Sequence, residues 1–357
     1  MGSQAATINL IDVGGVTGSQ AQLGFDLAAK YWGQMLTNNA TINLTVRFAA
    51  LNPGVIGSTG STRRDQSVTS WESAVNATKS NSTIDQNIVL PTLTSGGISG
   101  LTVGVNSAGN NDTSVGATLN GTQTASRVLY QNTSVIKALG GPVSAATIDG
   151  SMTFSSTFAF DFDARDGITA GTFDFLGVAI HEMGHALGFV SGVDFFDVYS
   201  YPNGPGRGSL GYDLNDTSIF SALDMFRYSA PGTLNMRTGG SPYFSIDGGQ
   251  TALMNGYFST GRYNGDGNQA SHWKEEPFCG VGLGIMDPTF CFGQMGFVTG
   301  QDLAAYDAMG WNLSVDALRY AGESSADIAR RLPEPDTWAL LIGALGLMAA
   351  SRRKKTV

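Results

Sequence analysis

Apolar and polar residues alternate along the chain in patterns that predict short helices and strands. Apolar side chains recur at helical spacing over Leu23–Leu36, so this stretch is predicted to be an amphipathic helix. Over Thr41–Ala49 every second residue is apolar, which predicts a strand. Other elements are predicted in the same way: helices over Val68–Thr78 and Ser126–Leu139, strands joined by loops over Thr92–Thr124, and one or two strands over Met152–Phe162.

The strongest helix pattern lies in the middle of the chain. Phe173–Phe189 is largely apolar, as expected for a buried helix, with Asp174 able to cap its start. Gly188 stands where a helix end favours a left-handed residue. From Ser191 to Ala270 the chain is rich in Gly, Pro, Asn and Tyr, which predicts loops interrupted by a short helix near Ser221–Tyr228.

A last helix is predicted over Gly300–Met309, between the cap Thr299 and the stop Gly310. A chain of 357 residues is long enough for two domains or for one catalytic domain with two lobes. The mixture of helices and strands predicts an α+β fold.

Charge and cysteine content narrow the class of protein. The net charge is -9, and the only basic run is Arg352–Lys355, so nucleic-acid binding is not expected. Only 14% of residues are charged, a balance that fits an exported bacterial protein better than a cytosolic one. Cys279 and Cys291 frame a short glycine-rich segment; they are either a disulfide or a pair of buried thiols, and we favour the disulfide.

Two histidines in the apolar helix have the spacing of metal ligands. His181 and His185 are four residues apart, so both side chains lie on one helix face and can reach one ion. Glu182 follows the first histidine and could take a proton from a water molecule on a catalytic zinc. The alternative interpretation is a buried structural histidine pair, or a chance match.

A zinc site of this kind needs a third protein ligand. The chain has three histidines in all, and the remaining one is His272, 87 residues after His185. We predict that His272 completes the site, against the alternative of an ordinary loop histidine beside a tryptophan. Asp194, Glu275 and Glu276 are the next candidates, since no glutamate lies between Glu182 and Glu275.

The segment His181–Gly188 resembles the first part of the metzincin signature. In most metzincins the third histidine stands three residues later, where this chain has Ser191. Leishmanolysin-like metzincins carry a long insertion before that histidine, and His272 followed by Trp273 is similar to their order. The resemblance implies a two-lobed α+β zinc peptidase with a twisted sheet and a central active-site helix. Its parts would be an N-terminal lobe (1–190), a C-terminal lobe (191–318) and a C-terminal segment (319–357). Met286 would form the Met-turn beneath the metal.

The end of the chain resembles the PEP-CTERM sorting signal of Gram-negative bacteria. Pro333-Glu334-Pro335 precedes an apolar run, Trp338–Ala350, which is followed by the basic cluster Arg352–Lys355. Thirteen apolar residues are short for a membrane span, which needs about 20. The resemblance implies export, transient membrane contact, processing by an exosortase, and a place at the cell surface or in an exopolysaccharide matrix, which is a further candidate partner. The alternative is a simple C-terminal helix.

Three further groups of residues are candidates for lesser roles. Asp163 and Asp166, near Asp161, have the composition of a calcium loop without its spacing, and we favour a solvated turn over a Ca²⁺ site. Asp224 and Arg227 form either a buried ion pair near the cleft or a pair on a helix surface. Four aromatic residues either line a substrate cleft or pack within loops, namely Phe195, Phe196, Tyr199 and Tyr201.

Together these features predict an exported zinc metalloendopeptidase acting on a protein or peptide. Glu182 would be its general base, and His181, His185 and His272 its zinc ligands. An extended peptide is expected to add to an edge strand such as Met152–Thr157. The alternatives are a surface- or matrix-binding protein that keeps a zinc site without turnover, and a metallohydrolase acting on other substrates.

Overall fold

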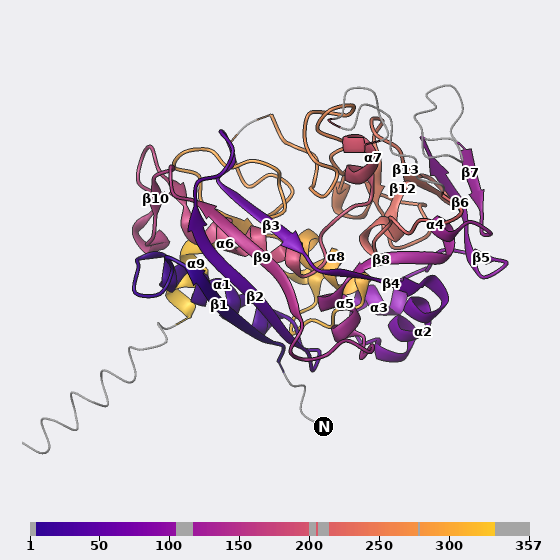
Figure 1. The fold of residues 1–357 in the computed structure, drawn as a ribbon, viewed down its shortest axis with the longest axis horizontal. Helices are drawn as coiled ribbons and strands as arrows, with labels where there is room; N and C mark the ends of the chain where they lie inside the picture. Colours follow the sequence, from indigo (N-terminus) through magenta and orange to yellow (C-terminus); the bar gives the residue numbers. More distant parts are fainter. Residues whose placement is uncertain (1–4, 105–116, 200–204, 206–213, 278, 333–357) are drawn as a thin grey trace, which may run out of the picture.

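The structure, a computed structural model, describes residues 5–104, 117–199, 205, 214–277 and 279–332 (Figure 1). Helices and strands are mixed along the chain, and the strands form several open sheets. This mixture is compatible with the predicted α+β class, and the finer two-lobed arrangement with a central active-site helix stays a prediction. Helix α1 (Ala21–Met35), strand β2 (Thr41–Ala49) and helix α2 (Val68–Thr78) form where the sequence predicts them.

The main sheet has the order β1-β2-β9-β3. Strand β1 (Thr7–Gly14) runs parallel to β2, and β2 runs parallel to β9 (Ile148–Ser155). Strand β3 (Gly57–Ser61) pairs antiparallel with β9 and forms the edge of the sheet. The prediction that Met152–Thr157 forms an edge strand is therefore wrong, because both sides of β9 are paired.

Helix α6 (Phe175–Ala186) lies against this sheet and against α1. The two helices approach closely at Gly24, where an added Cβ atom would lie 2.3 Å from the ring of Phe175. The indole of Trp32 in α1 also donates to the carbonyl of Ile180 at 3.0 Å. Gly24 thus makes room for the Phe175 ring, and Trp32 bonds the α6 backbone, so both hold α6 against α1.

Both predicted ends of α6 are present. Asp174 is the N-cap, and its carboxylate accepts the amide of Gly177 at 3.0 Å. After the helix, Gly188 adopts a positive φ of 126°. Strand β11 (Phe173–Asp174) immediately precedes α6 and pairs in parallel with β10 (Phe160–Asp161).

The predicted helix over Ser126–Leu139 is broken in the structure. A short helix, α4 (Thr124–Arg127), leads into strand β8 (Val128–Asn132), which is followed by α5 (Thr133–Ala138). Strand β8 forms because it pairs antiparallel with β4 (Arg63–Ser67), a distant segment that helical periodicity cannot take into account.

The last residue of β8 and the start of α5 hold the end of α6. The side chain of Asn132 donates to the carbonyl of His185 at 2.9 Å, and the hydroxyl of Ser134 donates to the carbonyl of Ala186 at 2.6 Å. Carbonyls in the last turn of a helix have no partner within the helix, so these two side chains satisfy them.

A second sheet combines strands from distant parts of the chain. Its order is β14-β12-β13-β6-β5, and β7 also pairs with β6. Its strands are β5 (Leu93–Thr94), β6 (Gly97–Val103), β7 (Ala117–Asn120), β12 (Arg227–Ala230), β13 (Thr233–Met236) and β14 (Tyr243–Phe244). Because β6 and β13 come from the two predicted lobes, the lobes share this sheet; the boundary at residue 190 stays a prediction.

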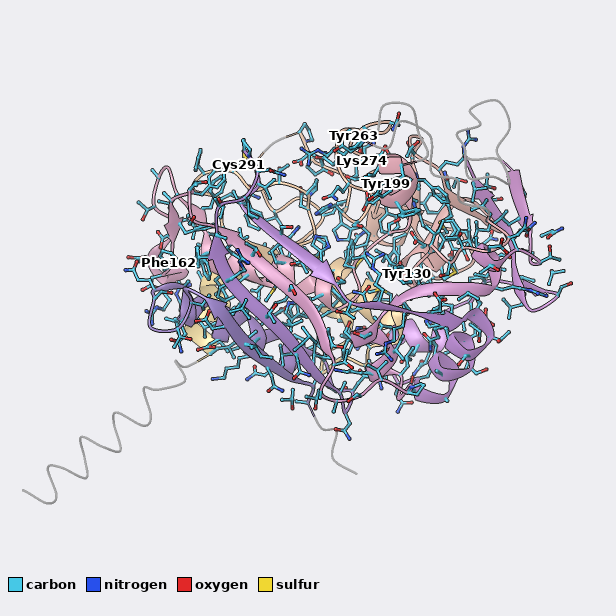
Figure 2. All side chains as sticks on the ribbon, in the orientation of Figure 1. Tyr130, Phe162, Tyr199, Tyr263, Lys274 and Cys291 are labelled. Carbon is cyan, nitrogen blue, oxygen red and sulfur yellow. A yellow bond between two sulfur atoms is a disulfide. The ribbon has the colours of Figure 1, made fainter. Side chains whose placement is uncertain are left out.

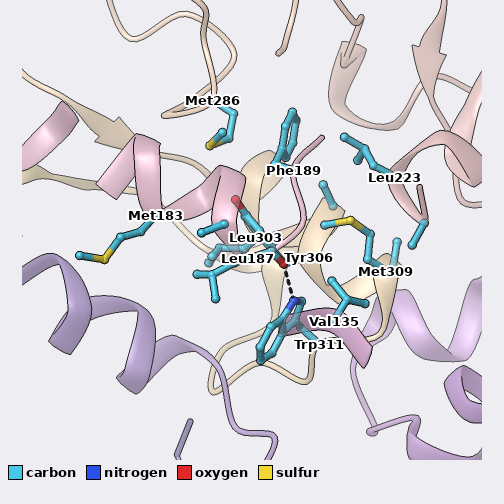
Figure 3. Packing of buried hydrophobic residues seen from close by; sticks show 14 of the residues in the cluster. Val135, Met183, Leu187, Phe189, Leu223, Met286, Leu303, Tyr306, Met309 and Trp311 are labelled. Atoms are coloured by element: carbon cyan, nitrogen blue, oxygen red, sulfur yellow. Dashed lines mark hydrogen bonds between the residues drawn. The ribbon is translucent and has the colours of Figure 1, made fainter. Parts of the chain in front are cut away.

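Helix α8 (Gly300–Met309) has both predicted ends. Thr299 and Asp302 form a capping box, and Gly310 adopts the left-handed conformation with φ 117°. The indole of Trp311 donates to the carbonyl of Leu187 at 2.9 Å, which joins the end of α8 to the end of α6 (Figure 3). The core is thus centred on α6.

One buried carboxyl group in α8 has an unusual environment. Asp307 is fully buried, and neither of its oxygens has a hydrogen-bond partner among the described residues. Burial and then the neighbouring carboxylates Asp85 and Asp316 raise the pKa of Asp307 to about 8. The hydroxyl of Ser82, which faces the group without hydrogen-bonding geometry, acts in the opposite direction.

The other elements are short. They are α3 (Thr83–Asn87), α7 (Val193–Tyr199), α9 (Ser325–Arg331), β15 (Phe297–Val298), β16 (Glu323–Ser324) and the 3-10 turns η1 (Ala164–Asp166), η2 (Leu223–Phe226), η3 (Leu253–Asn255) and η4 (Ala317–Arg319). Turn η2 lies where a short helix near Ser221–Tyr228 was predicted.

Cys279 and Cys291 form a disulfide with their Cα atoms 5.8 Å apart, as predicted. Within the described ranges, no helix combines the length and apolar character needed to cross a membrane. The motif Pro333-Glu334-Pro335, the run Trp338–Ala350 and the basic cluster Arg352–Lys355 lie outside the described residues.

Candidate metal centre

Three histidines from two distant segments meet at one point. The Nε2 atom of His185 lies 3.1 Å from that of His181 and 3.2 Å from that of His272, and the remaining pair is 3.3 Å apart. His181 and His185 lie on α6, whereas His272 comes from a loop 87 residues after His185. The structure therefore places the three imidazoles together as the sequence predicts.

The opposite nitrogen of each ring faces a backbone carbonyl. The Nδ1 atoms of His181 and His185 lie 2.7 Å from the carbonyl oxygens of Ile285 and Phe189, respectively. For His272 the corresponding oxygen belongs to Gln269, at 3.2 Å. These contacts fix the tautomer, because a carbonyl oxygen can only accept: each Nδ1 carries the hydrogen, and each neutral Nε2 has none.

Burial keeps these imidazoles neutral. It lowers the pKa of His181 to about 4 and that of His185 to about 3, and it brings the pKa of His272 well below its usual value. Three nitrogen lone pairs then converge with no hydrogen between them, an arrangement that is unfavourable unless a cation accepts them. The cluster could therefore bind a metal ion.

Glu182 lies beside the cluster with its carboxylate held by strand β3. The hydroxyl of Thr59 lies 2.7 Å from Oε2 of Glu182 and donates to it. An added Cβ atom at Gly57 would lie 2.6 Å from the other oxygen, Oε1, so this residue leaves room for the carboxylate. Burial raises the pKa of Glu182 to about 7. Edge strand β3 therefore sets the position of Glu182.

Met286 packs against helix α6, which carries His181 and His185. It is fully buried, and its sulfur would lie 2.5 Å from a Cβ atom added at Gly184, between the two histidines of α6 (Figure 3). Glycine at this position thus lets the Met286 side chain pack directly against the helix backbone. The Met-turn role that the metzincin resemblance implies for Met286 stays a prediction.

One carboxylate in α8 supports the segment around Met286. Asp302 is fully buried; its Oδ2 accepts the amide of Ile285 at 2.8 Å, and its Oδ1 accepts the amide of Met286 at 3.2 Å. The indole of Trp273 donates to Oδ1 at 2.9 Å. The carbonyl of Ile285 contacts the His181 ring, and Trp273 is the residue after His272. By binding both Ile285 and Trp273, Asp302 supports the positions of His181 and His272 indirectly.

The other carboxylates weighed as third ligands point elsewhere. Asp194 accepts the backbone amides of Ala270 and Ser271, Glu275 accepts the hydroxyl of Thr289 at 3.0 Å, and Glu276 is exposed. In the described part of the chain, the histidine trio is the one group of at least three His, Cys, Asp or Glu side chains close enough together to hold an ion.

Asp224 and Arg227 are both buried, so they are not a pair on a helix surface. The guanidinium donates to the carbonyls of Asn235 and Ser259 at 3.1 and 3.0 Å, and no direct ion pair with Asp224 is formed. Burial lowers the pKa of Arg227 to about 10, while the negative charge of Asp224 acts against this. The two groups interact through space rather than by contact.

The segment weighed as a calcium loop is held by its own side chains. Asp163 forms an ion pair with Arg165 at 2.7 Å, and Asp161 accepts the amide of Thr169 at 2.8 Å. Asp166 lies in the turn η1. These contacts support the solvated turn that the sequence favoured.

The aromatic residues of helix α7 differ in their exposure to solvent. Phe196 is buried in the core, whereas Tyr199 is 40% exposed and its ring lies 5.0 Å from that of Phe195. Tyr199 lies near Tyr263 in the view of Figure 2. Tyr201 lies outside the described residues. Phe196 is therefore a core residue, and a cleft role remains a prediction for the others.

Sequence reasoning missed several residues that support this centre. Thr59 and Gly57 carry no recognisable motif, and their role depends on the pairing of β3 beside α6. Asp302 has a local signal, the capping box with Thr299, but this signal predicts only a helix start.

Comparison with known proteins does not identify the chain: no family model matches it, and neither a curated protein nor a solved structure shows significant similarity. Any function must therefore be argued from the chemistry of the site.

Proposed function

We propose that the chain is an exported zinc-dependent metalloendopeptidase with a metzincin-like arrangement. The observation that carries this proposal is the convergence of the three Nε2 atoms, 3.1–3.3 Å apart, beside the buried Glu182. Tetrahedral ligands at about 2.0–2.1 Å from a zinc ion lie about 3.3–3.4 Å apart, so the spacing fits. Three protein ligands also leave a fourth position open, as in catalytic zinc sites.

Hydrolysis would depend on a bound metal ion, on Glu182 and on Thr59. A zinc ion, when bound, would supply the Lewis acidity that activates a water molecule and a peptide carbonyl. Glu182 takes the proton of the attacking water and passes it to the leaving amine. Thr59 donates to Oε2 of Glu182 at 2.7 Å and so leaves Oε1 free for this exchange.

The substrate would be an extended peptide that adds to strand β3. This strand has β9 on one side only, and it contacts α6 beside Glu182. An edge strand offers unpaired backbone groups to an incoming strand, which aligns the peptide by main-chain hydrogen bonds. Binding there would place a peptide bond next to the carboxylate.

Export is supported by the disulfide between Cys279 and Cys291, since such bonds persist in oxidising compartments. The PEP-CTERM-like tail adds an exosortase, a transient membrane contact and a cell-surface or matrix location to the proposal. These last points depend on the sequence of the tail alone.

Two measurements test the proposal. Elemental analysis of the dialysed protein should find one zinc ion per chain, because there is one histidine trio. In a digest of an unbiased peptide library, Glu182→Gln should keep its zinc and lose about 10²–10⁴-fold in rate. The exposed Glu276→Gln is the matched control and should behave as wild type.

Each outcome has a distinct meaning. A folded wild-type protein without metal would refute the zinc site. Zinc binding without cleavage of any library peptide would instead favour a surface-binding protein that keeps its metal, and equal rates for Glu182→Gln and wild type would remove Glu182 as the base.

A further inference from the structure

The loop that carries His272 is held by the segment that directly follows the metal-binding helix. Asp194, the second residue of α7, accepts the amide of Ala270 at 2.6 Å and the amide of Ser271 at 3.0 Å. The hydroxyl of Ser271 also donates to the Asp194 carboxylate. One side chain thus binds both residues that precede His272.

Ser191 holds the same loop from a second side. Its backbone amide donates to the hydroxyl oxygen of Ser271 at 2.8 Å. Its own hydroxyl donates to Asp224 at 2.5 Å, and the residue is 3% exposed. Ser191 occupies the position where most metzincins have their third histidine. In this chain that position anchors the loop of the later histidine.

His272 depends on this support more than the other two histidines do. Its Nδ1 contact, 3.2 Å to Gln269, is longer than the 2.7 Å contacts of His181 and His185, and Gln269 belongs to the same loop. The backbone carbonyl of His272 itself accepts the amide of Ser259 at 3.1 Å, and the next residue, Trp273, is buried. At Ala270 and Ser271, the two residues directly before His272, the hydrogen bonds come from Asp194 and Ser191.

We propose that Asp194, with Ser271 and the backbone of Ser191, is a positioning group that holds the His272 imidazole at the metal centre. An 87-residue excursion must close before His272 can bind a metal, and closing a long loop costs conformational entropy. The half-buried hydrogen bonds of Asp194 tie the end of that loop to α7. Metal affinity should therefore depend on Asp194 although it touches no metal.

The test uses the full chain with Co²⁺ as the probe, because its visible absorption reports the number and geometry of its ligands. Asp194→Asn keeps the size of the side chain, but its amide group would face a backbone N–H donor. We expect a 10–100-fold loss of Co²⁺ affinity, the range for residues that orient ligands, together with an altered absorption spectrum.

Asp197→Asn is the matched control on the same helix. Asp197 is 1% exposed and accepts the amides of Tyr263 and Asn264, each at 2.9 Å, and does not hydrogen-bond the residues that directly precede His272. This variant should lower the melting temperature while keeping the affinity and the spectrum of the wild type.

The proposal rests on the metal-binding part of the proposed function, and the outcomes separate the two. If wild type takes up neither Co²⁺ nor zinc, the metal centre itself is refuted. If wild type binds Co²⁺ and Asp194→Asn matches it in affinity and spectrum, or if Asp197→Asn loses as much affinity, the positioning role is overturned. Should Asp194→Asn fail to fold, the milder Ser271→Ala decides: unchanged affinity overturns the role, and weakened binding with an altered spectrum supports it.

Discussion

The most direct test of the arrangement around Glu182 is a single methyl group on the edge strand. An added Cβ atom at Gly57 would lie 2.6 Å from Oε1 of Glu182, whereas ordinary contact begins at 3.4 Å. The carboxylate in Gly57→Ala must therefore move by about 0.8 Å. The backbone at Gly57 does not have a positive φ, so alanine itself introduces no backbone strain there.

A shift of this size should affect catalysis more than stability. The carboxylate is the end of a flexible side chain and can move at little cost, but its hydrogen bond with Thr59 would be disturbed. Misplacement of a reacting group by about 1 Å can cost about 10²-fold in rate. We therefore expect Gly57→Ala to lose about 10²-fold in kcat/KM while keeping its zinc and its melting temperature.

The assay compares Gly57→Ala with Gly60→Ala in the same strand. A Cβ atom at Gly60 would meet nothing within 4 Å, so this variant controls for any effect of alanine on the strand. Rates are measured on one peptide identified from the library digest, with zinc content determined in parallel. If Gly57→Ala has the same rate as Gly60→Ala, the carboxylate of Glu182 does not act from its position beside Gly57.

Four other predictions follow from the same structure. His272→Ala should lower zinc affinity, measured by competition with a chelator, while circular dichroism shows that most of the fold remains; unchanged affinity would exclude it as a ligand. Asp302→Asn should lower the free energy of unfolding by about 3 kcal/mol or more in denaturant titrations, because its amide group would face backbone amides where the carboxylate now accepts. The pKa of Asp307 is raised from 3.8 to about 8, so its contribution to stability is fully present below about pH 4 and is lost progressively as pH rises to about 8. Asp307→Asn should therefore gain melting temperature relative to wild type between about pH 4 and about pH 8, and a difference that does not change with pH over this range would contradict the buried titration. Deleting residues 333–357, which keeps the buried Leu332, should leave peptide hydrolysis intact and change surface retention in fractionated cells; unchanged retention would count against the sorting signal.

The sequence alone determined the features that depend on neighbouring residues. The bounds of β2, α2 and α8 agree with those predicted, because periodicity and capping act over a few residues. The pairing of His181 and His185 on one face of α6 follows from the helical repeat for the same reason. Scarcity of histidine and resemblance, rather than geometry, pointed to His272.

Only the tertiary structure decided the features that depend on contacts between distant segments. Part of Ser126–Leu139, which has helical periodicity, forms strand β8 instead, because β4 supplies a partner strand. The order of the main sheet puts β3, not β9, at the edge, since Thr59 pairs with Met152, which in turn lies in a strand already paired with β2. Asp194, a candidate ligand by residue type, instead anchors the loop of His272. Residue type and spacing do not specify which distant backbone groups a carboxylate will contact. For Asp194 these groups are specified by the packing of α7 against the loop of His272.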